Sequence, residues 1–318
     1  MKKVYVVAFL LAAFLLLTFP LSTSAQEQPI NYDALALLRW YSANQTANFP
    51  AGEGPIALAF DGSHMWVANF GAGTVTELQA NDGTIVGTFA AGPRPWGLAY
   101  DGANLWVANQ IGSTVRKLRG SDGHLLGTYS TGTSSPRPGI CFDGSNIWVP
   151  LPNRVLKLSA RDGHLVGQYA VNGAARSIAF DGSNIWITAW GPDSVTKMRA
   201  SDGAELGNYP MASTPWGIAF DGTNLWVANQ GDNTVTKLRA SDGALQGTFP
   251  VGSAPTGVAF DGVNIWVTNQ GSNTVSKLLA SDGTLLGTFA TGHAPYGIAF
   301  DGANIWVANQ WDNFVSKR

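Results

Sequence analysis

An internal repeat constrains this chain more than any other feature. An aromatic residue followed by Asp-Gly recurs along the sequence, and successive Asp residues are 40, 42, 38, 40, 40 and 40 positions apart. The seven repeated residues are Asp61, Asp101, Asp143, Asp181, Asp221, Asp261 and Asp301. A sevenfold period near 40 residues restricts the chain to architectures that stack or circle similar units.

One representative unit runs from Pro215 to Gly252. Its alternating apolar and polar runs predict four short strands, at residues 217–220, 225–228, 234–239 and 244–251. Asp-Gly pairs between the first and second runs, and between the third and fourth, are typical of tight hairpin turns. Four antiparallel strands in about 40 residues form one propeller blade. We therefore predict an all-β fold, a seven-bladed β-propeller.

A tryptophan recurs at one place in the second predicted strand of every unit. A bulky indole at a fixed register indicates a packing layer between neighbouring sheets rather than a binding site. These scaffold residues are Trp66, Trp106, Trp148, Trp186, Trp226, Trp266 and Trp306.

The two ends of the repeat region predict how the ring closes. The last unit stops inside its third strand, at Arg318, and residues 45–52 resemble the fourth strand of another unit. We expect this N-terminal segment to complete the last blade, which removes two exposed sheet edges. Residues 33–39 also match a third strand loosely and compete with residues 314–318 for that place. We favour the C-terminal segment, with residues 32–41 as a short helix or a lid.

The first 25 residues have the pattern of an export signal. Lys2 and Lys3 precede an apolar run from Val4 to Leu21, and small residues lead to a predicted cleavage site after Ala25. An uncleaved anchor helix is the alternative, since the run approaches membrane-spanning length. Residues 26–43 then form a lead segment, and residues 44–318 form the propeller. We expect a monomer exported to the periplasm or the cell exterior, without membrane insertion after cleavage.

Charge and composition exclude several functional classes. The chain has 19 Lys and Arg residues against 21 Asp and Glu residues, which gives no basic footprint for nucleic acid. Four His residues and one Cys leave little material for a metal cluster, so we expect no metal and no cofactor. The Asp-Gly turns lack the clustered carboxylates of a calcium loop.

The repeat resembles known propeller families. Ile265-Trp266-Val267-Thr268-Asn269 and the following Asn273–Leu278 segment look like the YVTN-type repeat, with Trp where Tyr is usual. The units also resemble NHL-type propellers and the streptogramin-lyase-like group, over residues 44–318. That last resemblance implies a metal-assisted elimination that opens a cyclic peptide lactone, with His and Glu near the axial channel. The chain departs from that group, whose repeats typically carry Glu where this one has Asn69, Asn109, Asn229, Asn269 and Asn309.

The loops and turns that connect the strands of a four-stranded blade lie at two opposite ends of the propeller. The Asp-Gly turns share one end with His64, His124 and His164, which we interpret as solvated turn residues. The second-to-third loops and the blade-to-blade loops share the other end. A two-residue insertion in residues 131–139 and a two-residue deletion in residues 150–154 both fall at this second end.

Aromatic and arginine side chains outside the scaffold gather at this second end. Trp with Arg is a frequent recognition pair, and stacking or cation–π contacts can hold a sugar, a peptide or an anionic group. The predicted ligand-binding residues are Trp96, Trp190, Trp216, Tyr296, Trp311, Arg94, Arg137 and Arg176. The alternative is that these side chains only cover loop surface or plug the channel.

Two further residues are candidates for acid–base chemistry. Glu53 and His293 hold the same repeat position in the first and seventh units, which become neighbours when the ring closes. A His–carboxylate pair can transfer protons, so the alternative function is a lyase-like enzyme. No nucleophile motif accompanies the pair. We therefore favour an exported binding or scaffold protein that recognises a protein, peptide, glycan or small molecule; a structural envelope protein without a small ligand is the third possibility.

Overall fold

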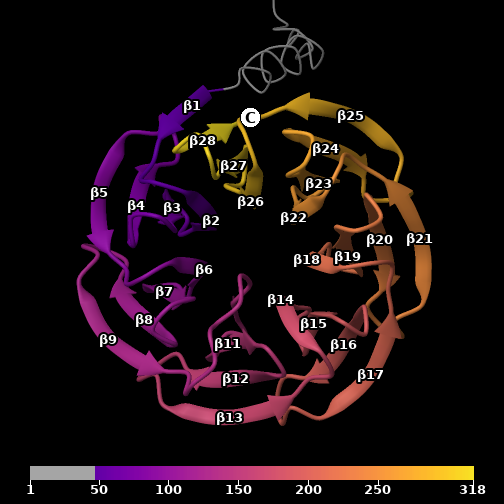
Figure 1. Cartoon of the computed structure of the whole chain (residues 1–318), viewed down its shortest axis with the longest axis horizontal. Helices are drawn as coiled ribbons and strands as arrows, with labels where there is room; N and C mark the ends of the chain where they lie inside the picture. The colour runs from indigo at the N-terminus through magenta and orange to yellow at the C-terminus, as the bar shows by residue number, and fades with distance from the viewer. Residues whose placement is uncertain (1–46) are drawn as a thin grey trace, which may run out of the picture. The chain divides into compact units, whose positions relative to one another are not determined.

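The structure, a computed structural model, describes residues 47–318, and the predicted signal and lead segment lie outside these residues. Seven four-stranded antiparallel sheets form a ring around a central axis (Figure 1). The predicted seven-bladed propeller is therefore confirmed. Within residues 47–318 the structure has no helix that is long and apolar enough to cross a membrane.

The strands follow the repeat. The first three blades are β2–β5 (Pro55–Phe60, His64–Asn69, Thr74–Gln79, Ile85–Ala90), β6–β9 (Pro95–Tyr100, Asn104–Asn109, Thr114–Arg119, Leu125–Ser130) and β10–β13 (Cys141–Phe142, Asn146–Leu151, Arg154–Ser159, Leu165–Ala170). The next three are β14–β17 (Ala174–Phe180, Asn184–Trp190, Ser194–Arg199, Glu205–Pro210), β18–β21 (Pro215–Phe220, Asn224–Asn229, Thr234–Arg239, Leu245–Pro250) and β22–β25 (Pro255–Phe260, Asn264–Asn269, Thr274–Leu279, Leu285–Ala290). The closing blade contains β26 (Pro295–Phe300), β27 (Ile305–Asn309), β28 (Phe314–Lys317) and β1 (Ala47–Pro50).

The closing blade is built from both ends of the described chain, as predicted. Strand β1 lies outermost and pairs antiparallel with β28, with Phe49 opposite Val315. The C-terminal segment thus fills the third strand of this blade. Phe49 also packs on Trp306, with ring centroids 5.5 Å apart, and the Ser316 hydroxyl bonds the Asn48 side-chain oxygen at 2.9 Å. Side-chain packing and hydrogen bonding therefore reinforce the backbone closure of the ring.

Each repeated tryptophan is fixed by the repeated aspartate five residues before it. The indole N–H donates to the carboxylate at 2.7 to 2.8 Å in all seven blades. The other carboxylate oxygen accepts the backbone amides of the turn, as Asp181 does from Ser183 and Asn184. The aspartate therefore shapes the first turn of the blade and satisfies a buried donor, which a solvated turn residue would not do.

The buried tryptophans pack across the joints between blades. Trp186 of the fourth blade lies in one cluster with Ile218, Leu225 and Val227 of the fifth. The other tryptophans lie in equivalent clusters, which confirms their predicted role as scaffold. Each joint thus has its own small core, instead of one core for the whole domain.

Lysine side chains connect successive blades at the end that carries the Asp-Gly turns. Lys157, for example, lies 5.2 Å from the ring centroid of Trp148 and donates to the carbonyl oxygens of Ala200 and Ser201 in the next blade. The same arrangement recurs with Lys117, Lys197, Lys237 and Lys317. We call this series the lysine relay; Lys277 also lies over its tryptophan.

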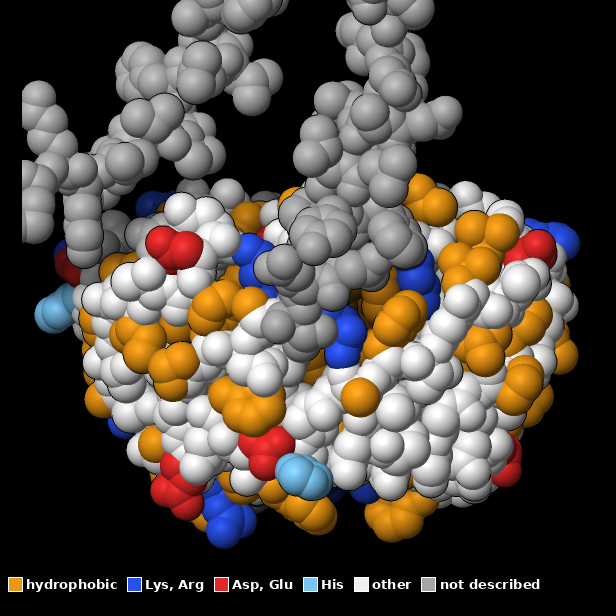
Figure 2. All heavy atoms as spheres, turned by 90° about the horizontal axis from the view of Figure 1, so that it is seen from above, with side chains coloured by type: hydrophobic (Ala, Val, Ile, Leu, Met, Phe, Trp, Pro, Cys, Tyr) orange, Lys and Arg blue, Asp and Glu red, His pale blue; other side chains and the backbone are white. Residues whose placement is uncertain are grey.

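The outermost strands face solvent. From Ile85–Ala90 in the first blade to Leu285–Ala290 in the sixth, the outermost strands show one burial pattern in which the first two residues are exposed. Figure 2 shows hydrophobic side chains on the side of the ring in separate groups between polar surface. Separate exposed apolar residues of this kind are common on protein surfaces and need no binding role.

The inner strands begin earlier than the sequence predicts. We expected the first strand of the fifth blade at residues 217–220, but β18 begins at Pro215, which pairs with Asn229. The pairing register then shifts before Ile218, and similar shifts occur in the other long inner strands. A bulge inserts unpaired residues that break the alternation of side chains, so the period-two pattern misses this part of the strand.

Candidate functional site

The functional site is built at these bulges. One residue of each unit lies five positions before the repeated aspartate. It is the second residue of the inner strand in five blades, the third residue in the fourth blade, and precedes the short inner strand in the third blade. We call the seven residues at this position the mouth ring: Ile56, Trp96, Pro138, Arg176, Trp216, Thr256 and Tyr296. The ring contains four of the predicted ligand-binding residues. They lie inside or against the inner strands rather than just before them, because the bulge extends each strand.

Six mouth-ring residues line a cavity of about 210 Å³ on the axis, and Arg176 lies against it on Trp216. Deeper in the channel the lining is aliphatic, with Leu58, Leu98, Ile140, Ile178, Ile218, Val258 and Ile298. The channel is therefore polar and aromatic at its mouth and apolar below. It is not filled by a plug formed from the described residues.

Glycine brings neighbouring inner strands close enough to narrow the channel. A Cβ atom on Gly257 would lie 2.5 Å from the carbonyl oxygen of Tyr296 in the next blade. Gly97, Gly217 and Gly297 meet neighbouring carbonyl groups in the same way. Any larger residue at this position would push the blades apart and widen the mouth.

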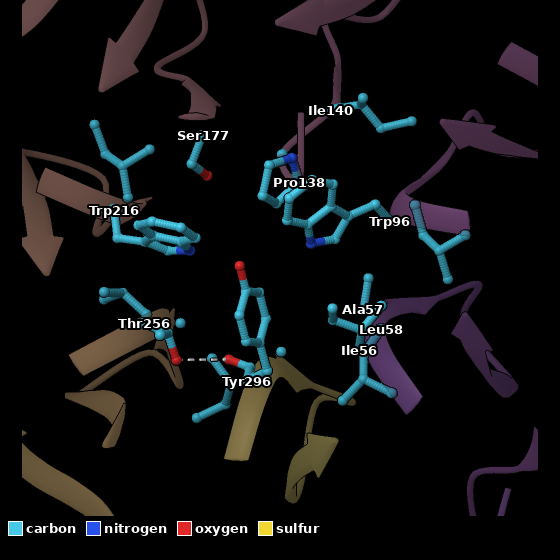
Figure 3. A pocket seen from close by; sticks show the side chains of 18 of the residues that line it. Ile56, Ala57, Leu58, Trp96, Pro138, Ile140, Ser177, Trp216, Thr256 and Tyr296 are labelled. Atoms are coloured by element: carbon cyan, nitrogen blue, oxygen red, sulfur yellow. Dashed lines mark hydrogen bonds between the residues drawn. The ribbon is translucent and has the colours of Figure 1, made fainter. Parts of the chain in front are cut away.

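Three polar atoms converge across the mouth. The indole nitrogens of Trp96 and Trp216 and the hydroxyl of Tyr296 point toward the same space (Figure 3). All three atoms are buried, and none has a hydrogen-bond partner within 3.5 Å in the part of the chain that the structure describes. Burial also raises the pKa of the Tyr296 hydroxyl above its usual value, so this group is protonated at neutral pH and can donate a hydrogen bond. The two indole groups nevertheless face the Tyr296 hydroxyl closely enough to lower its pKa slightly. Unpartnered buried donors in a cavity are unusual and indicate a ligand that accepts from them.

Arg176 supplies the positive charge of the site. Its side chain is only 9% exposed, and its guanidinium carbon lies 4.5 Å from the ring centroid of Trp216 and 4.9 Å from that of Trp190. Burial, and then the like charge of Arg137, lower the pKa of Arg176, but a guanidinium stays charged in a protein. No ion pair involves Arg176 or Arg137 among residues 47–318. The site therefore has cationic charge without a carboxylate partner.

Two buried threonines hold the aromatic residues of the mouth ring in place. The Thr188 hydroxyl donates to the carbonyl oxygen of Trp216 at 2.7 Å, and the Thr268 hydroxyl donates to that of Tyr296 at 2.8 Å. Four of the other blades have alanine at this position. The hydroxyl groups thus occur where the next blade contributes a functional aromatic residue. Sequence reasoning missed both threonines, although a threonine in place of the usual alanine is a visible exception to the repeat.

Arg94 reaches the site through a phenylalanine. Arg94 lies exposed over the Phe70 ring at 5.2 Å, and Phe70 packs edge-on against Trp96. Phe70 was missed in the sequence, although it replaces the Gln found at its position in four other blades. Arg94, Arg137 and Arg176 make no ion pair among residues 47–318.

Other predicted residues do not join the mouth ring. Trp190 is the last residue of β15, not a loop residue, and contacts the site only through Arg176. Trp311 lies in the loop between β27 and β28, is 74% exposed and does not line the channel. His293 pairs with Asp312 of its own blade, with Nδ1 to Oδ1 at 2.8 Å, and makes no ion pair with Glu53. The Glu53 side chain instead packs over Gly71.

The channel does not suit the metal that the lyase resemblance implies. Its lining residues include no imidazole and no carboxylate. The asparagines at the position where that family typically has Glu are buried and structural. The Asn69 side chain, for example, accepts the Gly52 amide and donates to the Thr76 hydroxyl. We therefore derive no metal-assisted step at the channel.

Comparisons with known proteins agree with the fold. No family model matches the chain, and no curated protein matches it. Among solved structures it is similar to the hydrazine synthase of Kuenenia stuttgartiensis, with a TM-score of 0.76 and 19% identity over 83% of this chain and 95% of that one. It is also similar to a streptogramin B lyase, with a TM-score of 0.73 and 20% identity over 86% of this chain and 96% of that one.

A selenomethionine-substituted virginiamycin B lyase from Staphylococcus aureus gives a TM-score of 0.73 and 20% identity, over 86% of this chain and 98% of that chain. The resemblance to streptogramin-lyase-like propellers is thus confirmed in the fold. Identity near one fifth supports the architecture alone and does not transfer a reaction to this chain.

Proposed function

We propose that this chain is an exported, non-catalytic binding protein whose channel mouth holds a small ligand with an anionic head group. One observation carries the proposal: two indole N–H groups and one phenol hydroxyl line a cavity that has no carboxylate, and the buried Arg176 guanidinium lies on the Trp216 ring beside it. These groups can bind a carboxylate by donating hydrogen bonds to it. The carboxylate oxygens need several such bonds once they leave water.

The size of the cavity limits what enters it. The volume of about 210 Å³ exceeds the roughly 150 Å³ of an engineered protein cavity that holds benzene. The head group of an amino acid, a short peptide or a sugar acid fits this space, and the rest of a longer ligand would lie on the rim. The aliphatic lining below favours an apolar substituent that points down the channel.

Aromatic faces at the mouth support the same ligand class. Trp96, Trp216 and Tyr296 enclose the space from three blades. Rigid aromatic side chains lose little conformational entropy on binding and frequently carry most of the binding energy at an interface. A lyase-like elimination remains the alternative function. It is disfavoured because Glu53 and His293, the only acid–base pair we could propose for it, do not pair.

Binding can be tested with a panel of amino acids, dipeptides and sugar acids, each paired with its uncharged amide or alcohol. Thermal stability and tryptophan fluorescence are the readouts. We expect at least one carboxylate to stabilise the protein, and its neutral partner to have no effect. Arg176→Gln and Tyr296→Phe should each weaken that binding at least tenfold, in keeping with the loss of a hydrogen bond to a charged group.

Ile111→Ala is the matched control, because Ile111 is 49% exposed on a rim loop and does not line the channel. It should leave binding unchanged. Equal responses to charged and neutral compounds, or unaltered binding by the Arg176→Gln variant, would disprove the anionic-ligand assignment. Turnover of a carboxylate compound would instead favour the lyase alternative.

Export is part of this proposal and has its own test. The mass of the protein recovered from the periplasm or medium should correspond to a chain that begins at Gln26. Recovery of the full-length chain in the membrane fraction would contradict cleavage and support the anchor alternative.

A further inference from the structure

One blade lacks the lysine of the relay. The third strand places a lysine opposite the repeated tryptophan in six blades, but β4 places Glu77 opposite Trp66. The equivalent carbonyl groups of the second blade, those of Gly120 and Ser121, receive no side-chain donor from the described residues. A buried carboxylate thus occupies the strand position at which the other blades carry an ammonium group.

Neighbouring positions differ at the joint between the first and second blades. His64 replaces the asparagine that follows the first turn in the other six blades, and Tyr100 replaces the usual phenylalanine before the second Asp-Gly pair. Gly120 replaces an alanine, and a Cβ there would lie 3.0 Å from the Tyr100 hydroxyl. These exceptions to the repeat are therefore gathered in one place.

The substituted side chains form a compact donor set. The Nδ1 atom of His64 lies 3.2 Å from Oδ2 of Asp61 and 3.3 Å from Oε1 of Glu77. One donor atom from each residue lies within 4.8 Å of the other two. Neighbouring ligands on a tetrahedral zinc ion, at bonds of about 2.0 Å, are separated by about 3.3 Å. The nitrogen–oxygen distances already have this spacing.

The donor set is anchored by the scaffold. Oδ2 of Asp61 accepts the Trp66 indole N–H at 2.8 Å, and Oδ1 accepts the backbone amides of Ser63 and His64. Hydrogen bonds of this kind orient the ligands of metal sites. His64 is consequently not a free turn residue, as the sequence suggested, but is held between two carboxylates.

The cluster carries more negative than positive charge. Glu77 is only 3% exposed, and its sole ionic contact among residues 47–318 is with His64. Burial raises the pKa of Glu77; the nearby His64 acts against this rise and the Asp61 carboxylate adds to it. The first blade thus adds a buried carboxylate to the repeated aspartate, at the strand position where each of the other six blades has a lysine.

We propose that Asp61, His64 and Glu77 bind a divalent cation, with zinc as the best match, within the one blade whose third strand lacks the lysine. An imidazole ligand with two carboxylates suits zinc better than calcium or magnesium, which prefer oxygen ligands alone. The site lies at the end of the propeller opposite the mouth ring, so it serves the scaffold and is independent of ligand binding.

The test uses tag-free, full-length protein after treatment with a chelator, and zinc ions alone as the probe. We expect one zinc ion per chain by elemental analysis and titration calorimetry, and a higher melting temperature with zinc. The His64→Asn/Glu77→Lys double variant restores the residues of the other blades, so it should fold. It should lose zinc binding at least a hundredfold and no longer respond to zinc in melting temperature.

His164→Ala is the control for surface histidines, because His164 pairs with Asp162 on an exposed turn at the same end. It should retain one zinc ion per chain. Less than a tenth of an equivalent bound at micromolar zinc, or equal binding by the double variant, would overturn the proposal. Carboxylate binding at the mouth should be the same with and without zinc, so the two proposals can fail separately.

Discussion

At the residue scale, one aspartate performs several tasks in each repeat. Asp181 caps the first turn of its blade, accepts the Asn184 side chain and accepts the indole N–H of Trp186. A tryptophan buried without an acceptor would lose a hydrogen bond that it makes with water in the unfolded chain. This requirement explains why the Asp-Gly pair and the tryptophan recur together.

Replacing this aspartate should destabilise one blade strongly. We expect Asp181→Ala to lower the free energy of unfolding by about 2–3 kcal/mol, because it leaves a buried N–H group and two turn amides without an acceptor. Urea unfolding measures the change. Asp202→Ala, at an exposed Asp-Gly turn of the same blade, should have a clearly smaller effect. Equal losses in the two variants would show that the indole bond is unimportant.

The sequence predicted those features that repeat and missed those that do not. Trp96, Trp216, Tyr296 and Arg176 were found because a variable residue at a fixed repeat position stands out. Phe70 was missed because phenylalanine is common along the chain, whereas a tryptophan outside the scaffold is conspicuous. The convergence of three polar atoms could not be predicted, since it depends on a bulge that turns side chains toward the axis. The cluster at Asp61 brings together substitutions that lie far apart in the sequence. Each of them alone looks like an ordinary exception to the repeat.

At the element scale, the ring depends on one short strand. β1 has four residues and pairs only with β28, whereas every other outermost strand is also joined to its partner by a tight turn. The stacking of Phe49 on Trp306 therefore contributes more to keeping β1 in place than the equivalent aromatic contact does elsewhere. The fourth-strand role of the N-terminal segment followed from sequence similarity between the repeats.

Phe49→Ala should release this strand. We expect faster hydrogen exchange in β1 and β28 and protease cleavage near residue 50, together with a loss of about 1–3 kcal/mol in stability. Phe249→Ala removes the equivalent contact with Trp226 from a strand held by a turn. It should lower stability without exposing its strand to proteases. Identical cleavage patterns in both variants would contradict a special role for Phe49.

At the scale of the whole molecule, Asp181 and Asp261 couple stability to acid. Burial alone would raise the pKa of Asp181 and of Asp261, but hydrogen bonds from tryptophan, asparagine and the turn amides outweigh it and lower both pKa values. A carboxylate with a lowered pKa in the folded state adds stability above its unfolded pKa, near 3.9. That contribution is lost as the pH falls through the lower, folded pKa.

The unfolding free energy should therefore be nearly constant from pH 7 to 5 and fall steeply below about pH 4. Urea unfolding at a series of pH values provides the measurement. In the Asp181→Asn variant the overall stability at pH 7 should be lower, and the drop between pH 5 and 3 should be smaller than in the parent protein. A parent profile that stays flat to pH 3 would show that these carboxylates do not control acid unfolding.

Glu77 gives an otherwise repetitive ring one blade whose third strand carries a negative charge at the lysine position. Five lysines tie one blade to its successor through backbone carbonyl groups, and Glu77 cannot make that tie. The joint after the first blade, like the one after the sixth within residues 47–318, therefore depends on its apolar core alone. If the ring is pulled apart mechanically, the joint after the first blade should open at a lower force than the five joints that a lysine ties.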